Sequence, residues 1–345
     1  MNNKKQITKG SHWLPRTYLK HFLIDNKLFM YKKGERFFKE GLKAEQRVVE
    51  VLGEAGLNNI AKENNLYRVE VKDIDPNFIE NLFREIIEDD LDKIIQEVKE
   101  KNIGDKIDEE LKKKLCLFIA TMRVRTPQFK WETNETLDKF LKMGVRLRME
   151  ASQNKPLGEA ERKQAKRDYL KDKGKLITDK ELDKEIEQAR KKIIEGNFEG
   201  IKIVDSSNKL FLKTALSNIE PSAIIFFGMK INILKAREDR YFITSDNPVV
   251  YFVPQDKVNF YNPSKSLVSP LTEVFFPLTK DCAIHLCRRS DLKEMIMSAS
   301  RELVDNFKEN IAYNSKDFIF SPIKMNFLNQ FVEEYIPYPF KLVSS

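Results

Sequence analysis

The hydrophobic pattern of this chain changes from a helical to an alternating period late in the sequence, and this change constrains the fold most. Apolar residues recur at roughly helical spacing along "DPNFIENLFREIIEDDLDKIIQEVKEK" and "EELKKKLCLFIATMRVR", which is typical of helices with one buried face. Beyond residue 229, short apolar runs such as "KINILKA" and "PVVYFV" alternate with turn residues, which indicates strands. Strands, then helices, then mainly antiparallel strands predict an α+β fold.

Three long helices are predicted in the central region. The first begins at Asp75, a plausible N-cap, with Pro76 at the first helical position. The second covers 109–125 and ends before Pro127, because proline disfavours helix in the residue that precedes it. The third covers "TLDKFLKMGVRLRMEA". Two more helical stretches are predicted later in the chain, at 208–228 and at 291–314.

The strands are predicted at both ends of the chain. "LFMYKKGERFF" reads as a hairpin around Lys33 and Gly34, and "YRVEVK" as a short strand. "KINILKA" and "RYFITS" indicate a second hairpin, and "TEVFFPLT", "CAIHLCR" and "DFIFSP" indicate further strands. We therefore expect a mainly antiparallel sheet built from N- and C-terminal strands.

Residues 151–200 differ from the rest, because they are mostly charged and carry few apolar residues. Acidic and basic residues four apart, such as Glu187 and Lys191, favour exposed helices around 158–172 and 178–196. We predict one α+β domain over 1–345 with a projecting charged insertion at 151–200. The insertion is either a solvated surface excursion or an arm for nucleic acid or self-association.

Charge and cysteine content narrow the classes of protein. The 61 basic side chains exceed the 53 acidic ones, and the net charge of +8 permits nucleic-acid binding without demonstrating it. No apolar run is long enough to span a bilayer, and the N-terminus lacks the apolar region of a secretory signal. Three cysteines suit a reducing compartment, so we expect a cytoplasmic protein without a membrane partner or a structural zinc site.

The segment "GSHWLPRTYLKHF" brings several side chains that can take part in binding or catalysis together near the N-terminus. Trp13, Leu14, Tyr18 and Phe22 can dock the segment onto a core. Pro15 stiffens the chain, which would hold His12 in a defined pose. Histidine titrates near neutral pH and can act as a general acid or base, so the segment is also a candidate half of an active site.

Four motifs in this order resemble a known family. They are H-x-x-P-x-x-Y-L at 12–19, "IIE" at 86–88, "RTP" at 125–127 and "SDNP" at 245–248, followed by "PLT" at 277–279. The order and spacing resemble the bacterial family catalogued as domain of unknown function 4238, over roughly 12–322. The resemblance transfers no activity. It implies only that the following residues fall on matching motif positions: His12, Pro15, Tyr18, Glu88, Arg125, Ser245 and Asp246.

The candidate catalytic residues are His12, Glu88, Arg125 and Asp246, and the candidate binding residues are Arg16, Tyr18, Ser245 and Asn247. Each has a purely structural alternative. Asp246 and Asn247 could form a turn before Pro248, Arg125 could interact with a helix C-terminus, and Glu88 could be solvated. We expect His12, Arg125 and Asp246 to meet around one cleft.

A histidine for proton transfer, carboxylates that orient it and arginines that hold an anion suit phosphodiester cleavage. The leading expectation is a nuclease that acts as a toxin or phage-defence effector on nucleic acid, with self-association through 151–200 as a further expectation. We expect no tightly bound metal, the alternative being Mg²⁺ held by Glu88 and Asp246. The rival class is a non-catalytic module that binds nucleic acid or protein, in which His12 and Asp246 form a structural hydrogen-bond lock.

Overall fold

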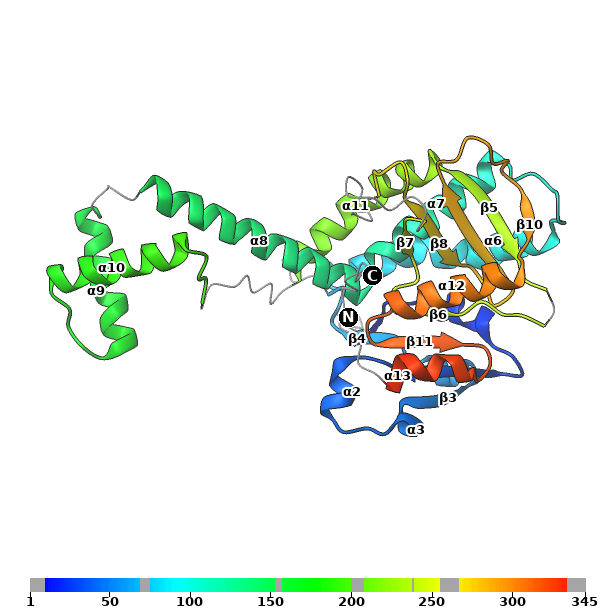
Figure 1. Ribbon diagram of the computed structural model, residues 1–345, viewed down its shortest axis with the longest axis horizontal. Coiled ribbons are helices and arrows are strands. Elements are labelled where there is room, and N and C mark those ends of the chain that lie inside the picture. Colours follow the sequence, from blue (N-terminus) through cyan, green and yellow to red (C-terminus); the bar gives the residue numbers. More distant parts are fainter. Residues whose placement is uncertain are drawn as a thin grey trace, which may run out of the picture. The chain divides into compact units, whose positions relative to one another are not determined.

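The computed structural model describes residues 10–68, 75–152, 157–199, 208–237, 239–254 and 267–333. It divides into two compact units, which Figure 1 shows in the colours of the sequence. The first unit combines Met1–Trp131 with Ser207–Ser345, and the second is Glu132–Ser206. The first unit contains the sheets and both termini, and the predicted α+β class is confirmed.

A four-stranded antiparallel sheet joins the two ends of the sequence. Its strand order is β3-β2-β11-β6, with β3 at Val48–Leu52, β2 at Lys27–Lys32, β11 at Phe318–Ser321 and β6 at Thr244–Ser245. In Figure 1 the blue N-terminal strands lie beside the orange C-terminal strand β11. This arrangement brings the N-terminal segment next to elements that lie almost three hundred residues later in the chain.

A five-stranded sheet is built from C-terminal strands alone. Its order is β10-β5-β9-β8-β7, and every pairing is antiparallel except that of β10 with β5. A third sheet has two strands, β1 and β4, in which His12 pairs with Lys62. The bounds are β1 Gly10–His12, β4 Lys62–Asn64, β5 Lys230–Lys235, β7 Val250–Phe252, β8 Glu273–Pro277, β9 Cys282–Cys287 and β10 Ile296–Ser298.

Long helices pack against these sheets. Helix α7 packs along α11, and α12 contacts both β6 and β7. Helix α7 begins where Asp108 accepts a hydrogen bond from the Leu111 backbone N–H (2.9 Å), which satisfies an otherwise free donor of the first turn. The longer helices are α5 Phe78–Phe83, a π-helical segment η2 Arg84–Glu88, α6 Asp89–Glu100, α7 Glu109–Val124, α11 Lys209–Phe227 and α12 Arg301–Asn314.

Short helices connect the strands. They are α1 Arg16–Leu19, η1 Lys20–Phe22, α2 Glu35–Lys39, α3 Ala44–Arg47, α4 Gly53–Leu57, η4 Asn326–Asn329 and α13 Gln330–Glu333.

The N-terminal segment docks on the core as its apolar residues predict. Trp13, Leu14, Tyr18 and Phe22 are all buried. The Tyr18 ring lies 5.2 Å from the Phe22 ring and 5.7 Å from the Phe276 ring, measured between centroids. Buried aromatic pairs of this kind contribute about 0.5–1.5 kcal/mol beyond the burial of their area. The segment is therefore held firmly, which gives His12 a defined position.

Several local predictions differ from the structure. The hairpin at 28–38 is wrong, because β2 continues into helix α2 and pairs instead with β3 and β11. The backbone N–H groups of Lys33 and Gly34 donate to the Asp317 carbonyl oxygen, which directs the chain towards β11. A Cβ at Gly34 would lie 1.9 Å from Asp317 Oδ1, so a larger residue here would force the Asp317 side chain to move.

The second predicted hairpin is also wrong. Strand β5 pairs with β9 and β10, whereas β6 pairs with β11. The predicted helix over 291–314 is shorter, because 296–298 form strand β10 and α12 begins after its N-cap Ser300. The helix predicted from Asp75 begins at Phe78. Most of the strand predicted at 67–72 lies outside the described residues.

The second unit is helical and highly charged. It contains most of α8 (Pro127–Ala151), together with α9 (Glu159–Lys173) and α10 (Asp179–Ile194). Arg162 pairs with Asp183 at 2.6 Å, which links α9 to α10. Helix α9 buries none of its described side chains, as expected for a sequence with few apolar residues.

Helix α11 is the one described helix that is long and apolar enough to cross a membrane. It contains Pro221, and it packs along α7 with the following buried residues: Phe211, Leu212, Ala215, Ile219, Ser222 and Phe226. One such helix is weak evidence of a membrane span, because a core helix of a folded domain can have the same length and composition.

Candidate functional site

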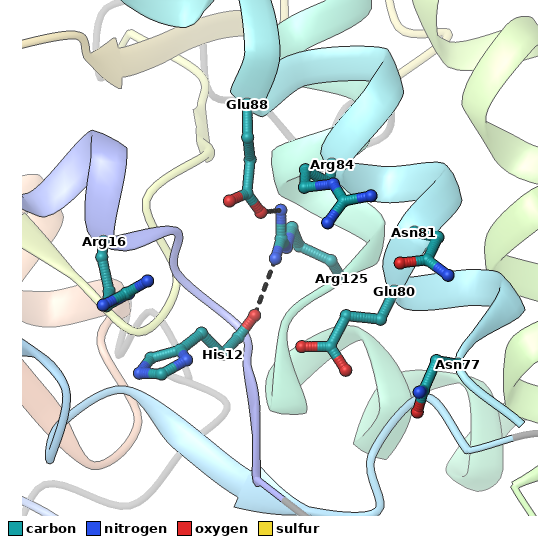
Figure 2. A pocket seen from close by; sticks show the side chains of 8 residues that line it. All are labelled: His12, Arg16, Asn77, Glu80, Asn81, Arg84, Glu88 and Arg125. Atoms are coloured by element: carbon teal, nitrogen blue, oxygen red, sulfur yellow. Dashed lines mark hydrogen bonds and ion pairs between the residues drawn. The ribbon is translucent and has the colours of Figure 1, made fainter. Parts of the chain in front are cut away.

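A polar pocket of about 200 Å³ lies between the N-terminal segment, the α5–η2 helix and the end of α7. Figure 2 shows Arg125 between Glu88 and the His12 carbonyl oxygen, with a dashed line to each. All the lining residues are polar or charged: His12, Arg16, Asn77, Glu80, Asn81, Arg84, Glu88 and Arg125. Three arginines and two glutamates make this pocket suited to an anion with hydrogen-bonding oxygens.

Arg125 connects the walls of the pocket. Its guanidinium is only 2% exposed, donates to Glu88 Oε1 at 3.2 Å and donates to the His12 carbonyl oxygen at 2.7 Å. The guanidinium also lies 5.2 Å from the centre of the Phe83 ring, and the Tyr67 hydroxyl donates to the Arg125 carbonyl oxygen. Since the side chain is buried and bonded on two sides, Arg125 fixes the position of His12 relative to η2.

His12 is half-buried, and its Nε2 is a buried atom that has no hydrogen-bond partner among the described residues. Burial lowers the pKa of the imidazole, and the positive charge of Arg16 lowers it further. A hydrogen bond with the Asn58 backbone raises the pKa but does not reverse the shift. His12 is therefore neutral at neutral pH, the form that can accept a proton.

Glu80 is the second titratable group with a shifted pKa in this pocket. Burial raises the pKa of its carboxyl group, while the Ser11 hydroxyl, which donates to Oε2 at 3.2 Å, and the charge of Arg125 lower it. The raised pKa favours the protonated form relative to an exposed glutamate. The pocket thus holds a histidine whose proton affinity is lowered and a glutamate whose proton affinity is raised.

Sequence reasoning identified His12, Arg16, Glu88 and Arg125, and the structure brings these four together. Sequence reasoning missed four further lining residues: Asn77, Glu80, Asn81 and Arg84. Their spacing carries a signal, since residues three, four and seven apart lie on one face of a helix. The π-helical segment at 84–88 is a second signal, because such segments occur frequently at functional sites. It is visible only in the structure.

Asp246 does not line this pocket, so the expectation that it meets His12 and Arg125 is wrong. Its carboxylate accepts hydrogen bonds from the backbone N–H groups of Lys316 (2.9 Å), Asp317 (2.5 Å) and Phe318 (3.1 Å). Asp246 therefore anchors the turn between α12 and β11, and its position after β6 reflects this structural role.

The other three predicted binding residues also lie elsewhere. The buried Tyr18 hydroxyl donates to the Pro277 carbonyl oxygen at 2.6 Å, and Thr244 Oγ1 lies 2.8 Å from it. Ser245 Oγ accepts from the Asn247 backbone N–H, and Asn247 Nδ2 donates to the Asn314 carbonyl oxygen. These contacts hold β6 and its following turn in place, so the three residues are part of the scaffold.

A buried lysine completes this scaffold beside Asp246. Lys33 Nζ donates to the carbonyl oxygens of Ala312 (2.6 Å) and Ser315 (3.0 Å), at the end of α12. Burial lowers the pKa of Lys33 to about 8, although the Asp246 charge raises it. Burial also raises the pKa of Asp246 to about 6. The lock predicted between His12 and Asp246 does not form, because their side chains have separate partners.

The carboxylates predicted to share Mg²⁺ are also separate, because Glu88 bonds to Arg125 and Asp246 bonds to the turn after α12. Over the described ranges, no group of three or more His, Cys, Asp or Glu side chains is arranged to hold a metal ion.

Comparison with known proteins identifies one family. The model of the family described as "Protein of unknown function (DUF4238)" matches residues 11–324, which is nearly the whole chain. The chain belongs to this family. The match includes both the polar pocket and the Asp246 scaffold of this DUF4238 protein. No curated protein and no solved structure matches the chain.

Proposed function

We propose that this DUF4238 protein is a nuclease that hydrolyses phosphodiester bonds in the pocket around His12. The observation that carries the proposal is that His12, whose buried Nε2 has no hydrogen-bond partner in the described part of the chain, is among the residues that line a pocket with three arginines. Buried polar atoms are nearly always hydrogen-bonded, so an orphaned one requires an explanation. The net charge of +8 supports an anionic substrate.

In the proposed reaction, neutral His12 takes the proton of a water molecule as its oxygen bonds to phosphorus. The bond from phosphorus to the leaving oxygen breaks, and protonated Glu80 donates its proton to that oxygen. The lowered pKa of His12 favours its neutral form, and the raised pKa of Glu80 increases the share of its acid form relative to an exposed glutamate. A proton-transfer group of this kind contributes about 10²–10⁴-fold to a rate.

The arginines have different proposed roles. Arg16 is exposed at the pocket, and Arg84 extends from η2, so these two would hold the phosphate oxygens. Arg125 is buried between Glu88 and the His12 carbonyl oxygen, which makes it a positioning residue. Glu88 would act through Arg125 in the same way.

The test is cleavage of labelled RNA and single-stranded DNA by the purified protein, with Mg²⁺ or with EDTA. We expect wild type to cleave, and both His12→Asn and Glu80→Gln to lose about 10²-fold or more with an unchanged melting temperature. His21→Asn is the matched control, because His21 pairs with Asp92 outside the pocket. Absence of cleavage by wild type, or equal rates for the His12 and His21 variants, would refute the proposal.

The biological part of the proposal is that the nuclease acts as a toxin or phage-defence effector. Induced expression in bacteria should reduce colony counts for wild type and the His21 variant but not for the His12 variant. Equal colony counts for all three would contradict this part alone.

A second candidate function is a non-catalytic nucleic-acid-binding module. The bonds of Arg125 to Glu88 and to the His12 carbonyl oxygen favour this function, because a guanidinium bonded on two sides has less freedom to follow a reacting phosphate. This function predicts a gel shift that weakens as salt rises, without any cleavage product.

A further inference from the structure

A second cavity lies beside the His12 pocket and has a different chemical character. It has a volume of about 420 Å³, within the range of about 300–1,000 Å³ that is typical of small-molecule sites. We call it the aromatic cavity, because Trp13, Phe37 and Phe318 line it. The proposed reaction uses none of these residues.

The aromatic rings form one continuous wall. The Trp13 and Phe318 rings are stacked with centroids 6.2 Å apart, and the Phe37 ring lies 5.6 Å from the Phe318 ring. Arg36 lies over this wall, with its guanidinium carbon 4.6 Å from the Phe37 centroid and 5.1 Å from the Phe318 centroid. Trp13 and Phe37 are buried, so a planar ligand would reach this wall by taking the place of the Arg36 guanidinium or by stacking on it.

Cations surround the wall. Lys32, Arg36 and Lys62 line the aromatic cavity, and no carboxylate is among its described lining residues. Lys62 and Arg36 are exposed, so both can reach an incoming anion. Aromatic faces with basic side chains form the combination that binds single-stranded nucleic acid, since bases stack and phosphates are neutralised. The amide side chains of Asn59 and Asn64, also in the lining, can bond to base edges.

The cavity and the pocket meet at the end of strand β1. His12 lines the pocket, the adjacent Trp13 lines the cavity, and Lys62 pairs with His12 in the β1–β4 sheet. Lys62 lies near enough to His12 for its charge to act on the imidazole. A single strand with one phosphate at His12 could therefore extend past Lys62 towards the aromatic cavity.

We propose that the aromatic cavity binds a nucleotide unit of a single-stranded nucleic acid next to the phosphate at His12. This inference rests on the proposed function for its substrate class. The stacked base and its phosphate would set how the strand enters the pocket. The cavity would therefore favour single-stranded over double-stranded substrates, because a paired base cannot leave its stack without cost.

The test measures binding of the full chain to a fluorescein-labelled thymidine strand about eight nucleotides long. All binding variants carry His12→Asn, so that the strand stays intact and the readout does not depend on cleavage. A strand of equal charge with abasic sites in place of the bases should bind about tenfold more weakly. Arg36→Ala should weaken binding of the thymidine strand about tenfold, whereas Lys39→Ala should not.

Lys39 is the matched control because it lies on the same helix α2, is exposed and pairs with Glu35 at 2.6 Å. Equal binding of the abasic and thymidine strands, or equal affinities of the two variants, overturns the inference. Competition by a polyglutamate peptide as strong as that of the thymidine strand would also overturn it, in favour of an acidic protein ligand.

Cleavage by wild type together with equal affinities of the Arg36 and Lys39 variants would refute the aromatic cavity and leave the nuclease proposal in place. The expected binding differences without any cleavage would support the cavity and refute the nuclease proposal.

Discussion

Asp246 offers the sharpest test of the distinction between scaffold and site. Its carboxylate accepts three backbone hydrogen bonds, one on Oδ1 from Lys316 and two on Oδ2 from Asp317 and Phe318. Asp246→Ala removes all three acceptors in a buried position. At about 1 kcal/mol for each lost bond, the free energy of unfolding should fall by about 3 kcal/mol.

Asp246→Asn should cost less, about 1–2 kcal/mol, because the amide oxygen can replace Oδ2 and keep two donors satisfied. Its NH₂ group would then face the Lys316 N–H, so one bond is lost. The matched control is Asp305→Asn, an exposed residue of α12 that pairs with Lys308, which should change stability by less than about 0.5 kcal/mol.

Thermal and urea unfolding followed by circular dichroism measure these differences. A loss of about 3 kcal/mol should lower the melting temperature by about 4–5 °C, because the unfolding entropy of a chain of this size is about 0.7 kcal/mol/K. The folded fraction of Asp246→Ala at low temperature should retain the cleavage rate of wild type. An unchanged melting temperature combined with a lost cleavage rate would refute the reasoning and return Asp246 to the catalytic residues.

Three further predictions concern the pocket and the second unit. The pKa of His12, followed by NMR, should lie below 6.5, and Arg16→Met should raise it. Because the unfolded chain binds the proton more tightly than the folded chain, the free energy of unfolding should fall as the pH drops below 6.5. His12→Asn should remove that pH dependence. Arg125→Met should destabilise the fold by about 3–5 kcal/mol in urea unfolding, because it leaves the buried partners of Arg125 unpaired. If residues 157–199 mediate self-association, their deletion should convert an oligomer into a monomer in light scattering, and an unchanged mass would contradict that role.

The sequence predicted helices better than strand partners, and particular residues show why. Asp108 and Pro127 lie at opposite ends of the helical pattern at 109–125, and α7 has almost those bounds. In contrast, "LFMYKKGERFF" has the alternation and turn of a hairpin, yet β2 pairs with β3 and with β11, which lies nearly three hundred residues away. Alternation indicates that a strand has two different faces, but it carries no information about which strand lies beside it.

The sequence likewise predicted only part of the candidate site. His12, Glu88 and Arg125 were identified from motif order and residue chemistry, and they meet at the pocket. Asp246 was chosen by the same reasoning and belongs to the scaffold, because turns and catalytic sites both use acidic residues after a strand. Glu80 was missed, since an acid on a helix surface looks solvated until the opposite wall of the pocket is known.

The sequence by itself determined the α+β class, the presence of the long helices and the charged helical character of the second unit. These features depend on the local spacing of apolar and charged side chains, which the chain carries wherever it folds. Only the tertiary structure decided that β2 pairs with β11 and that Arg125 holds His12 against η2. Such contacts depend on which distant segments bury each other's surfaces, and that choice is made by the free energy of the whole chain.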